Sequence, residues 1–138
     1  MPIAIRYIDG GKGVILTGEG VVTGTDLLAA NKEIYSRDLV AEPYHYGLFD
    51  ADGLTGITAS TEEMRALAAA SIAVARRMPR FVIAIYAKDS LTFGLARMWE
   101  AFVEQSGWIT HVFRERPRAV AWVKAEVEKR LGLQIALE

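Results

Sequence analysis

The stretch Phe81-Val-Ile-Ala-Ile-Tyr-Ala87 is apolar throughout, and it decides the fold class of this chain. A run of this kind is typical of a parallel strand that is covered on both of its faces. Ser90 follows as a helix cap, and apolar residues then recur at helical spacing at Leu91, Leu95, Met98, Trp99 and Phe102. A buried strand followed by an amphipathic helix indicates one unit of a mainly parallel sheet.

The same alternation of strand and helix continues on both sides of this unit. Upstream, residues 45–49 predict a strand that ends at Asp50, and Ser60-Thr-Glu-Glu63 has the form of a capping box before a helix. Downstream, residues 109–113 predict a last strand. A final helix opens at Pro117 and is closed by Gly132, which is a natural C-terminal cap.

The N-terminal residues predict an antiparallel hairpin. Residues 3–8 and 13–19 are both strand-like, and Asp9-Gly10-Gly11 between them suits a tight turn with positive φ. Thr23 or Thr25 then caps a helix that runs to about Arg37, and the polar residue Asn31 interrupts its apolar stripe. The predicted order is therefore ββαβαβαβα, an α/β fold with a mainly parallel sheet, an N-terminal antiparallel hairpin and four helices.

Composition excludes several classes of function. The 138 residues include 16 Lys plus Arg, 17 Asp plus Glu, 2 His and no Cys, with a formal net charge of −1. Without cysteine there is no thiolate nucleophile or zinc ribbon. His45 and His111 lie too far apart in the chain to suggest a metal site. The near-neutral charge argues against nucleic-acid binding. We expect neither a metal nor a cofactor.

The chain is predicted to be a single cytoplasmic domain spanning residues 1–138. No apolar run approaches the ~20 residues that span a bilayer, and residues 1–11 lack the pattern of a signal peptide. The apolar content of 51% favours a homodimer. Residues 133–138 alternate apolar and other side chains, which fits either a frayed terminus or an extended C-terminal arm that pairs with a sheet edge of another subunit.

Polar residues gather where the predicted parallel strands end, which is where open α/β sheets bind ligands. An ordinary charged loop surface would carry the same kinds of residues. The residues concerned are Asp50, Asp52, Lys88, Asp89, Ser90, Arg114 and Glu115.

Asp50-Ala-Asp52-Gly53 after an apolar strand resembles the first motif of haloacid-dehalogenase-type phosphohydrolases. The resemblance implies a nucleophilic Asp50, an acid/base Asp52 and Mg²⁺. Lys88 and Ser90 could supply two further groups. However, no second acidic pair follows a later strand, and Leu54 stands where that family has Thr. A Mg²⁺-dependent phosphohydrolase is therefore the alternative hypothesis, and we expect a protein without catalytic residues.

A second resemblance covers nearly the whole chain. Its most distinctive phrases are Phe93-Gly-Leu-Ala-Arg-Met98 and Val112-Phe-Arg with Ala119-Val-Ala-Trp122, and Leu48-Phe-Asp50 with Ala51-Asp-Gly-Leu-Thr-Gly-Ile57 adds to them. With these phrases the chain resembles the SpoIIAA-like, STAS-type proteins, a bacterial group of small single-domain proteins. The resemblance implies their layered α/β fold.

Better-known STAS relatives are anti-sigma factor antagonists, which bind a partner kinase and are switched by phosphorylation of a serine. The matching stretch here is Thr58-Ala-Ser60-Thr61, without the family's Asp and Gly. Ser60 and Thr61 are therefore candidate phosphorylation sites, although Glu62 and Glu63 would repel a phosphate and Ser60 also suits a helix cap.

The same group is similar in architecture to lipid-binding CRAL-TRIO domains, which implies an apolar ligand under the third helix. The leading hypothesis is a non-enzymatic STAS-like regulatory module that binds a protein partner or a small apolar ligand. A lipid carrier is a further alternative. The candidate binding residues are Asp50, Asp52, Lys88, Asp89, Phe93 and Arg97.

Overall fold

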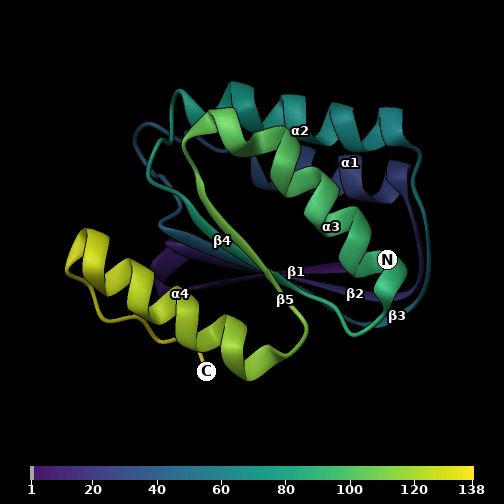
Figure 1. The fold of residues 1–138 in the computed structure, drawn as a ribbon. Helices are drawn as coiled ribbons and strands as arrows, with labels where there is room; N and C mark the ends of the chain where they lie inside the picture. The colour runs from purple at the N-terminus through teal and green to yellow at the C-terminus, as the bar shows by residue number, and fades with distance from the viewer. Residues whose placement is uncertain (1) are drawn as a thin grey trace.

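The computed structural model describes residues 2–138. These residues form one five-stranded sheet and four α-helices, in the predicted order (Figure 1). The elements are β1 (Ile3–Ile8), β2 (Gly13–Thr23), α1 (Gly24–Ile34), β3 (Tyr46–Thr58), α2 (Thr61–Ala75), β4 (Val82–Tyr86), α3 (Ser90–Val103), β5 (Ile109–Phe113) and α4 (Arg116–Leu131), with 3-10 turns at Asp9–Gly11 and Glu104–Ser106. The predicted fold class is confirmed.

The strands lie side by side in chain order, β1-β2-β3-β4-β5. The β1–β2 pair is antiparallel and the other pairs are parallel. Each parallel strand is added on the same side of the strand before it, and connections from a strand through a helix to the next parallel strand are right-handed. The helices that make these connections must therefore lie on the same face of the sheet. Accordingly α1, α2 and α3 cover one face, and α4 lies on the other (Figure 1).

This layering divides the buried core in two. The larger part lies between the sheet and α1–α3 and includes Phe81, Trp99 and Trp108. The smaller part lies between the sheet and α4, where Tyr46, Tyr86 and other side chains pack on the valines of α4. Alternate residues of β4 serve the two parts, since successive side chains of a strand point to opposite faces. The apolar run at residues 81–87 is thus covered on both faces, as predicted.

The prediction that the third strand ends at Asp50 is wrong, because β3 continues to Thr58. Its second half pairs with the end of β2, from Glu19 opposite Gly53 to Thr23 opposite Thr58. The glycines in this segment permit close approach of the two strands: a Cβ on Gly53 would lie 2.8 Å from the carbonyl oxygen of Gly18. Backbone pairing therefore extends a segment that looks like a loop in the sequence.

One helix cap also differs from the prediction. Asp89, not Ser90, caps α3, because its carboxylate accepts a hydrogen bond from the Thr92 backbone N–H at 2.9 Å. Leu91 is 61% exposed rather than buried. The capping box of Ser60 and Glu63 is confirmed, with both reciprocal hydrogen bonds formed.

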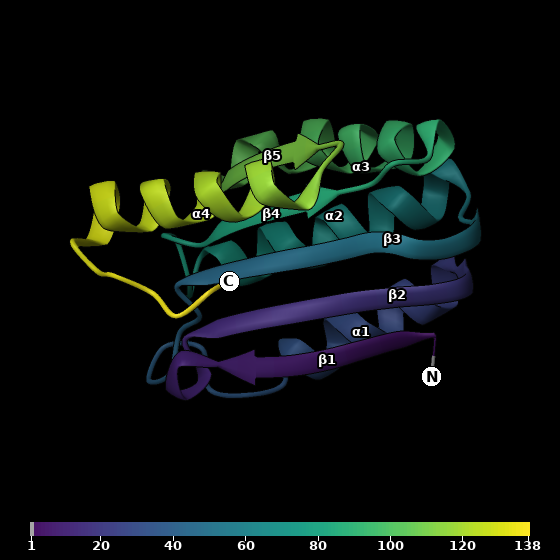
Figure 2. The same ribbon diagram turned by 90° about the horizontal axis from the view of Figure 1, so that it is seen from below.

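The residues after α4 turn back toward the sheet (Figure 2). Gly132 has φ +67° and closes the helix, as predicted. The following segment has no regular secondary structure, but Leu137 is only 1% exposed and packs into the core beneath α4. Asp9 accepts a hydrogen bond from the Ala136 backbone N–H at 3.0 Å, and Arg116 donates to the Glu138 carbonyl oxygen. These contacts fold the tail onto its own chain.

Candidate apolar binding pocket

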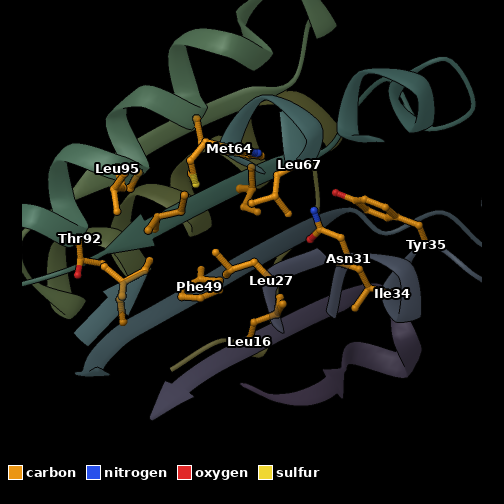
Figure 3. Close-up of a pocket in the computed structure, with 16 residues that line it drawn as sticks. Leu16, Leu27, Asn31, Ile34, Tyr35, Phe49, Met64, Leu67, Thr92 and Leu95 are labelled. Atoms are coloured by element: carbon orange, nitrogen blue, oxygen red, sulfur yellow. The ribbon is translucent and has the colours of Figure 1, made fainter. Parts of the chain in front are cut away.

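A pocket of about 90 Å³ lies between α1, α2, α3 and the sheet (Figure 3). None of the 16 side chains that line it carries a charge. They are Leu16, Leu27, Asn31, Ile34, Tyr35, Phe49, Ala51, Ile57, Met64, Leu67, Ile83, Ile85, Thr92, Leu95, Ala96 and Trp99.

Each wall of the pocket follows from the periodicity of its element. Odd-numbered residues of β3 and β4 such as Phe49 and Ile85 point to the face covered by α1–α3, and they form part of the floor of the pocket. On α3 a helical repeat brings Leu95 and Trp99 to the same side. The apolar stripe predicted for the third helix is therefore only partly used in core packing, and the rest faces a cavity.

One end of the pocket contains a partly buried chain of hydrogen bonds. The hydroxyl groups of Tyr35 and Ser71 lie 3.1 Å apart, and the Ser71 hydroxyl donates to the Leu67 carbonyl oxygen at 3.2 Å. Burial raises the pKa of Tyr35 to about 12, because a phenolate would lose its hydration there. Asn31 lies one helical turn before Tyr35 and lines the same pocket (Figure 3).

The opposite end of the pocket is closed by the start of α3. Thr92 is buried, and both its backbone N–H and its hydroxyl bond to the Asp89 carboxylate, at 2.9 and 3.0 Å. These bonds hold the pKa of Asp89 below its ordinary value. Asp89, one of the predicted binding residues, therefore positions the helix that covers the pocket.

The predicted acidic pair lies on the other face of the sheet. Asp50 and Asp52 have the same parity on β3 as Leu48, which packs beneath α4. The Asp50 carboxylate accepts the Asp52 backbone N–H at 2.9 Å, and Asp52 lies 3.8 Å from the Lys88 ammonium group. Partial burial raises the pKa of Asp52, and Lys88 opposes that shift.

Two arginines organise the polar surface around this pair. Arg116 donates to the Tyr86 hydroxyl at 2.9 Å, and burial together with the neighbouring Asp50 carboxylate raises the pKa of Tyr86 to about 12. Arg114 donates to the Lys88 carbonyl and the Ser90 hydroxyl at 3.3 and 3.4 Å. The groups of this surface are therefore largely paired with one another.

The other predicted site residues do not join one site. Phe93 lies beneath Arg114, whose guanidinium carbon is 3.9 Å from the ring centroid. Arg97 instead pairs with Glu100 at 3.3 Å, beside a separate hollow between α3 and β5. The structure thus brings Asp50, Asp52 and Lys88 together and separates Arg97 from them.

The candidate phosphorylation sites begin α2. The Ser60 hydroxyl accepts the Glu63 backbone N–H at 3.1 Å and acts as the N-cap, while Thr61 is the first helical residue and is exposed.

Within residues 2–138, no group of three or more His, Cys, Asp or Glu side chains is arranged to hold a metal ion. None of the helices in this part of the chain combines the length and the apolar character needed to cross a bilayer.

No protein-family model matches the chain, and no curated protein matches it. Solved structures of similar fold include an uncharacterised protein of the DUF3478 family with a SpoIIAA-like fold from Shewanella loihica PV-4. The sequence identity is 16% and the TM-score 0.49, with 88% of this chain and 91% of that chain covered.

The resemblance to lipid-binding domains indicates the position of the pocket, but the sequence does not identify its lining. The apolar stripes of α1 and α2 predict burial, and periodicity does not distinguish a filled space from an empty one. Asn31 is the one signal that could have indicated the pocket, since a polar residue within an apolar stripe requires a partner or a solvent-accessible space.

Proposed function

We propose that this protein is a non-enzymatic STAS-like module that binds a small apolar ligand in the pocket beneath α3. The observation that carries the proposal is a cavity in which no lining side chain is charged. Ligand sites are concave and mostly apolar, with a few polar groups that fix orientation. Asn31, Tyr35 and Thr92 are polar groups of this kind.

The size of the cavity limits the part of a ligand that can be enclosed. An engineered apolar cavity of about 150 Å³ holds benzene, and the volume here is about 90 Å³. A short chain or a small ring therefore fills the closed part, and a longer molecule must extend through the opening. This supports a small ligand in preference to a large lipid that is fully enclosed.

Native mass spectrometry of the purified protein, together with NMR titration with benzene and n-hexane, tests the proposal. The expected result is a retained small molecule, or shifts confined to residues around the pocket. Ala96→Leu extends a side chain into the cavity and should abolish binding. Ala101→Leu places the same change on an exposed position of α3 and should leave binding intact. No binding of either probe to the ligand-free protein would refute the proposal.

The same mass spectrum measures the oligomeric state, for which a homodimer remains our prediction. The polar surface of Asp50, Asp52 and Lys88 remains a candidate contact for a protein partner. The apolar pocket is favoured over it because the groups of that surface already bond to one another.

A further inference from the structure

Asn31 is the feature of the pocket that its apolar character leaves unexplained. Its backbone carbonyl accepts the Tyr35 N–H at 2.9 Å, as a helix requires. Its side-chain carboxamide is half-buried and lines the cavity, and among residues 2–138 the hydrogen bond that Asn31 forms is this backbone one (Figure 3). A carboxamide offers both a donor and an acceptor, and its placement against apolar side chains costs free energy unless it is hydrogen-bonded.

The direction of the neighbouring hydrogen bonds determines what Tyr35 can offer. Ser71 uses its single proton on the Leu67 carbonyl, so the Tyr35 hydroxyl must be the donor in the bond between Tyr35 and Ser71. The Tyr35 proton is thereby committed, and the lone pairs of its oxygen remain as an acceptor. This end of the pocket therefore presents one free acceptor from Tyr35 and both functions of the Asn31 carboxamide.

We propose that the pocket selects an uncharged ligand with a hydroxyl head group, which donates to the Tyr35 oxygen and accepts from the Asn31 carboxamide. This inference rests on the proposed function, because it assigns the chemistry of the ligand that the pocket holds. A hydroxyl group is both donor and acceptor, so it satisfies both residues at once. A hydrocarbon satisfies neither of them.

Charged head groups fit this end poorly. A carboxylate has no proton to donate to Tyr35, and no lysine or arginine lines the pocket to balance its charge. An ammonium group has donors but finds no carboxylate among the lining residues. Burial that raises the pKa of Tyr35 to about 12 also shows that a negative charge is disfavoured there.

Four ligands with the same six-carbon chain separate the contribution of the head group to affinity from that of the chain. They are 1-hexanol, n-hexane, hexanoate and hexylamine, each titrated at pH 7 by NMR. We expect 1-hexanol to bind at least about tenfold more tightly than hexanoate or hexylamine, because both of these bury an uncompensated charge. Asn31→Leu should weaken 1-hexanol about threefold to tenfold, the value of one neutral hydrogen bond, and leave n-hexane unchanged. Tyr35→Phe should act in the same direction.

Asn31→Asp is the most discriminating variant, because it keeps the shape of the side chain and adds a negative charge. It should change the preference from 1-hexanol to hexylamine. Lys32→Leu, on the exposed side of α1, is the matched control for Asn31→Leu and should not alter the order of affinities. Far-UV circular dichroism checks that each variant is folded.

The outcomes distinguish the two proposals. If all four ligands bind with similar affinity and the Asn31 variants change nothing, the pocket binds apolar ligands but the head-group inference is wrong. Tighter binding of hexanoate than of 1-hexanol would also overturn it. If none of the four binds, the proposed function fails and the inference fails with it.

Discussion

The C-terminal tail provides a sharp test of the packing, because a segment without secondary structure places a leucine in the core. Leu137 is 1% exposed and contacts the cluster that includes Tyr46 and Val127. Truncation of a buried leucine to alanine costs about 2–5 kcal/mol. The tail lies at the surface and can relax, so Leu137→Ala should lower the free energy of unfolding by about 2 kcal/mol, near the lower limit of that range.

Urea unfolding followed by circular dichroism measures this change. About 2 kcal/mol corresponds to a decrease in Tm of about 4–8 °C for a domain of this size. The matched control is Leu133→Ala, because Leu133 belongs to the same tail but is 37% exposed. It should cost about 0.5 kcal/mol or less.

Amide hydrogen exchange reports on the same contact locally. The Ala136 N–H, which donates to Asp9, should be protected in the wild-type protein and exchange faster in Leu137→Ala. Equal stability of the Leu137 and Leu133 variants, with an unprotected Ala136 amide in the wild type, would refute the packing of the tail described above.

Three further predictions concern polar groups. Tyr46→Phe removes a 2.6 Å hydrogen bond to Asp9 and should cost about 1 kcal/mol at pH 7. That bond lowers the pKa of Asp9, so the stability that it contributes is present above the ordinary pKa of 3.8 and is lost as pH falls through the folded-state pKa. The difference in free energy of unfolding between the variant and the wild type should therefore shrink below pH 3.8. Ser60→Ala should cost about 1 kcal/mol in urea unfolding through loss of the N-cap, whereas Thr61→Ala should be nearly neutral. A screen of phosphomonoesters with Mg²⁺ should give no turnover, and activity that Asp50→Asn abolishes would contradict the proposal of a non-enzymatic module.

The order of the elements could be predicted from the sequence because each strand and helix has its own periodicity. The apolar run at residues 81–87 and the capping box at Ser60 are local signals, and both predictions are confirmed. The length of β3 could not be predicted, because residues 51–58 are held extended by pairing with β2, which is distant in the chain. Glycines that suggest a turn in the sequence serve there to bring two strands together.

The site was harder to predict than the fold, for a related reason. A cluster at the strand ends was predicted from charge, and the structure does bring Asp52 and Lys88 together. The prediction places Asp50 at the end of its strand, whereas the structure places it inside β3. The pocket needs three helices on one face, a property of the whole topology rather than of any one motif.

The strand order has a consequence for how the chain folds. Each strand pairs with the strand that precedes it in the sequence, from β1 through β5. A chain of this topology can therefore add one helix and one strand at a time to a growing sheet edge, and it need never insert a strand between two others. Such local pairing keeps the loop-closure cost of every step low. The hydrogen bond from residue 136 back to Asp9 joins segments near the two ends of the chain. It can form only after the sheet beneath the tail exists.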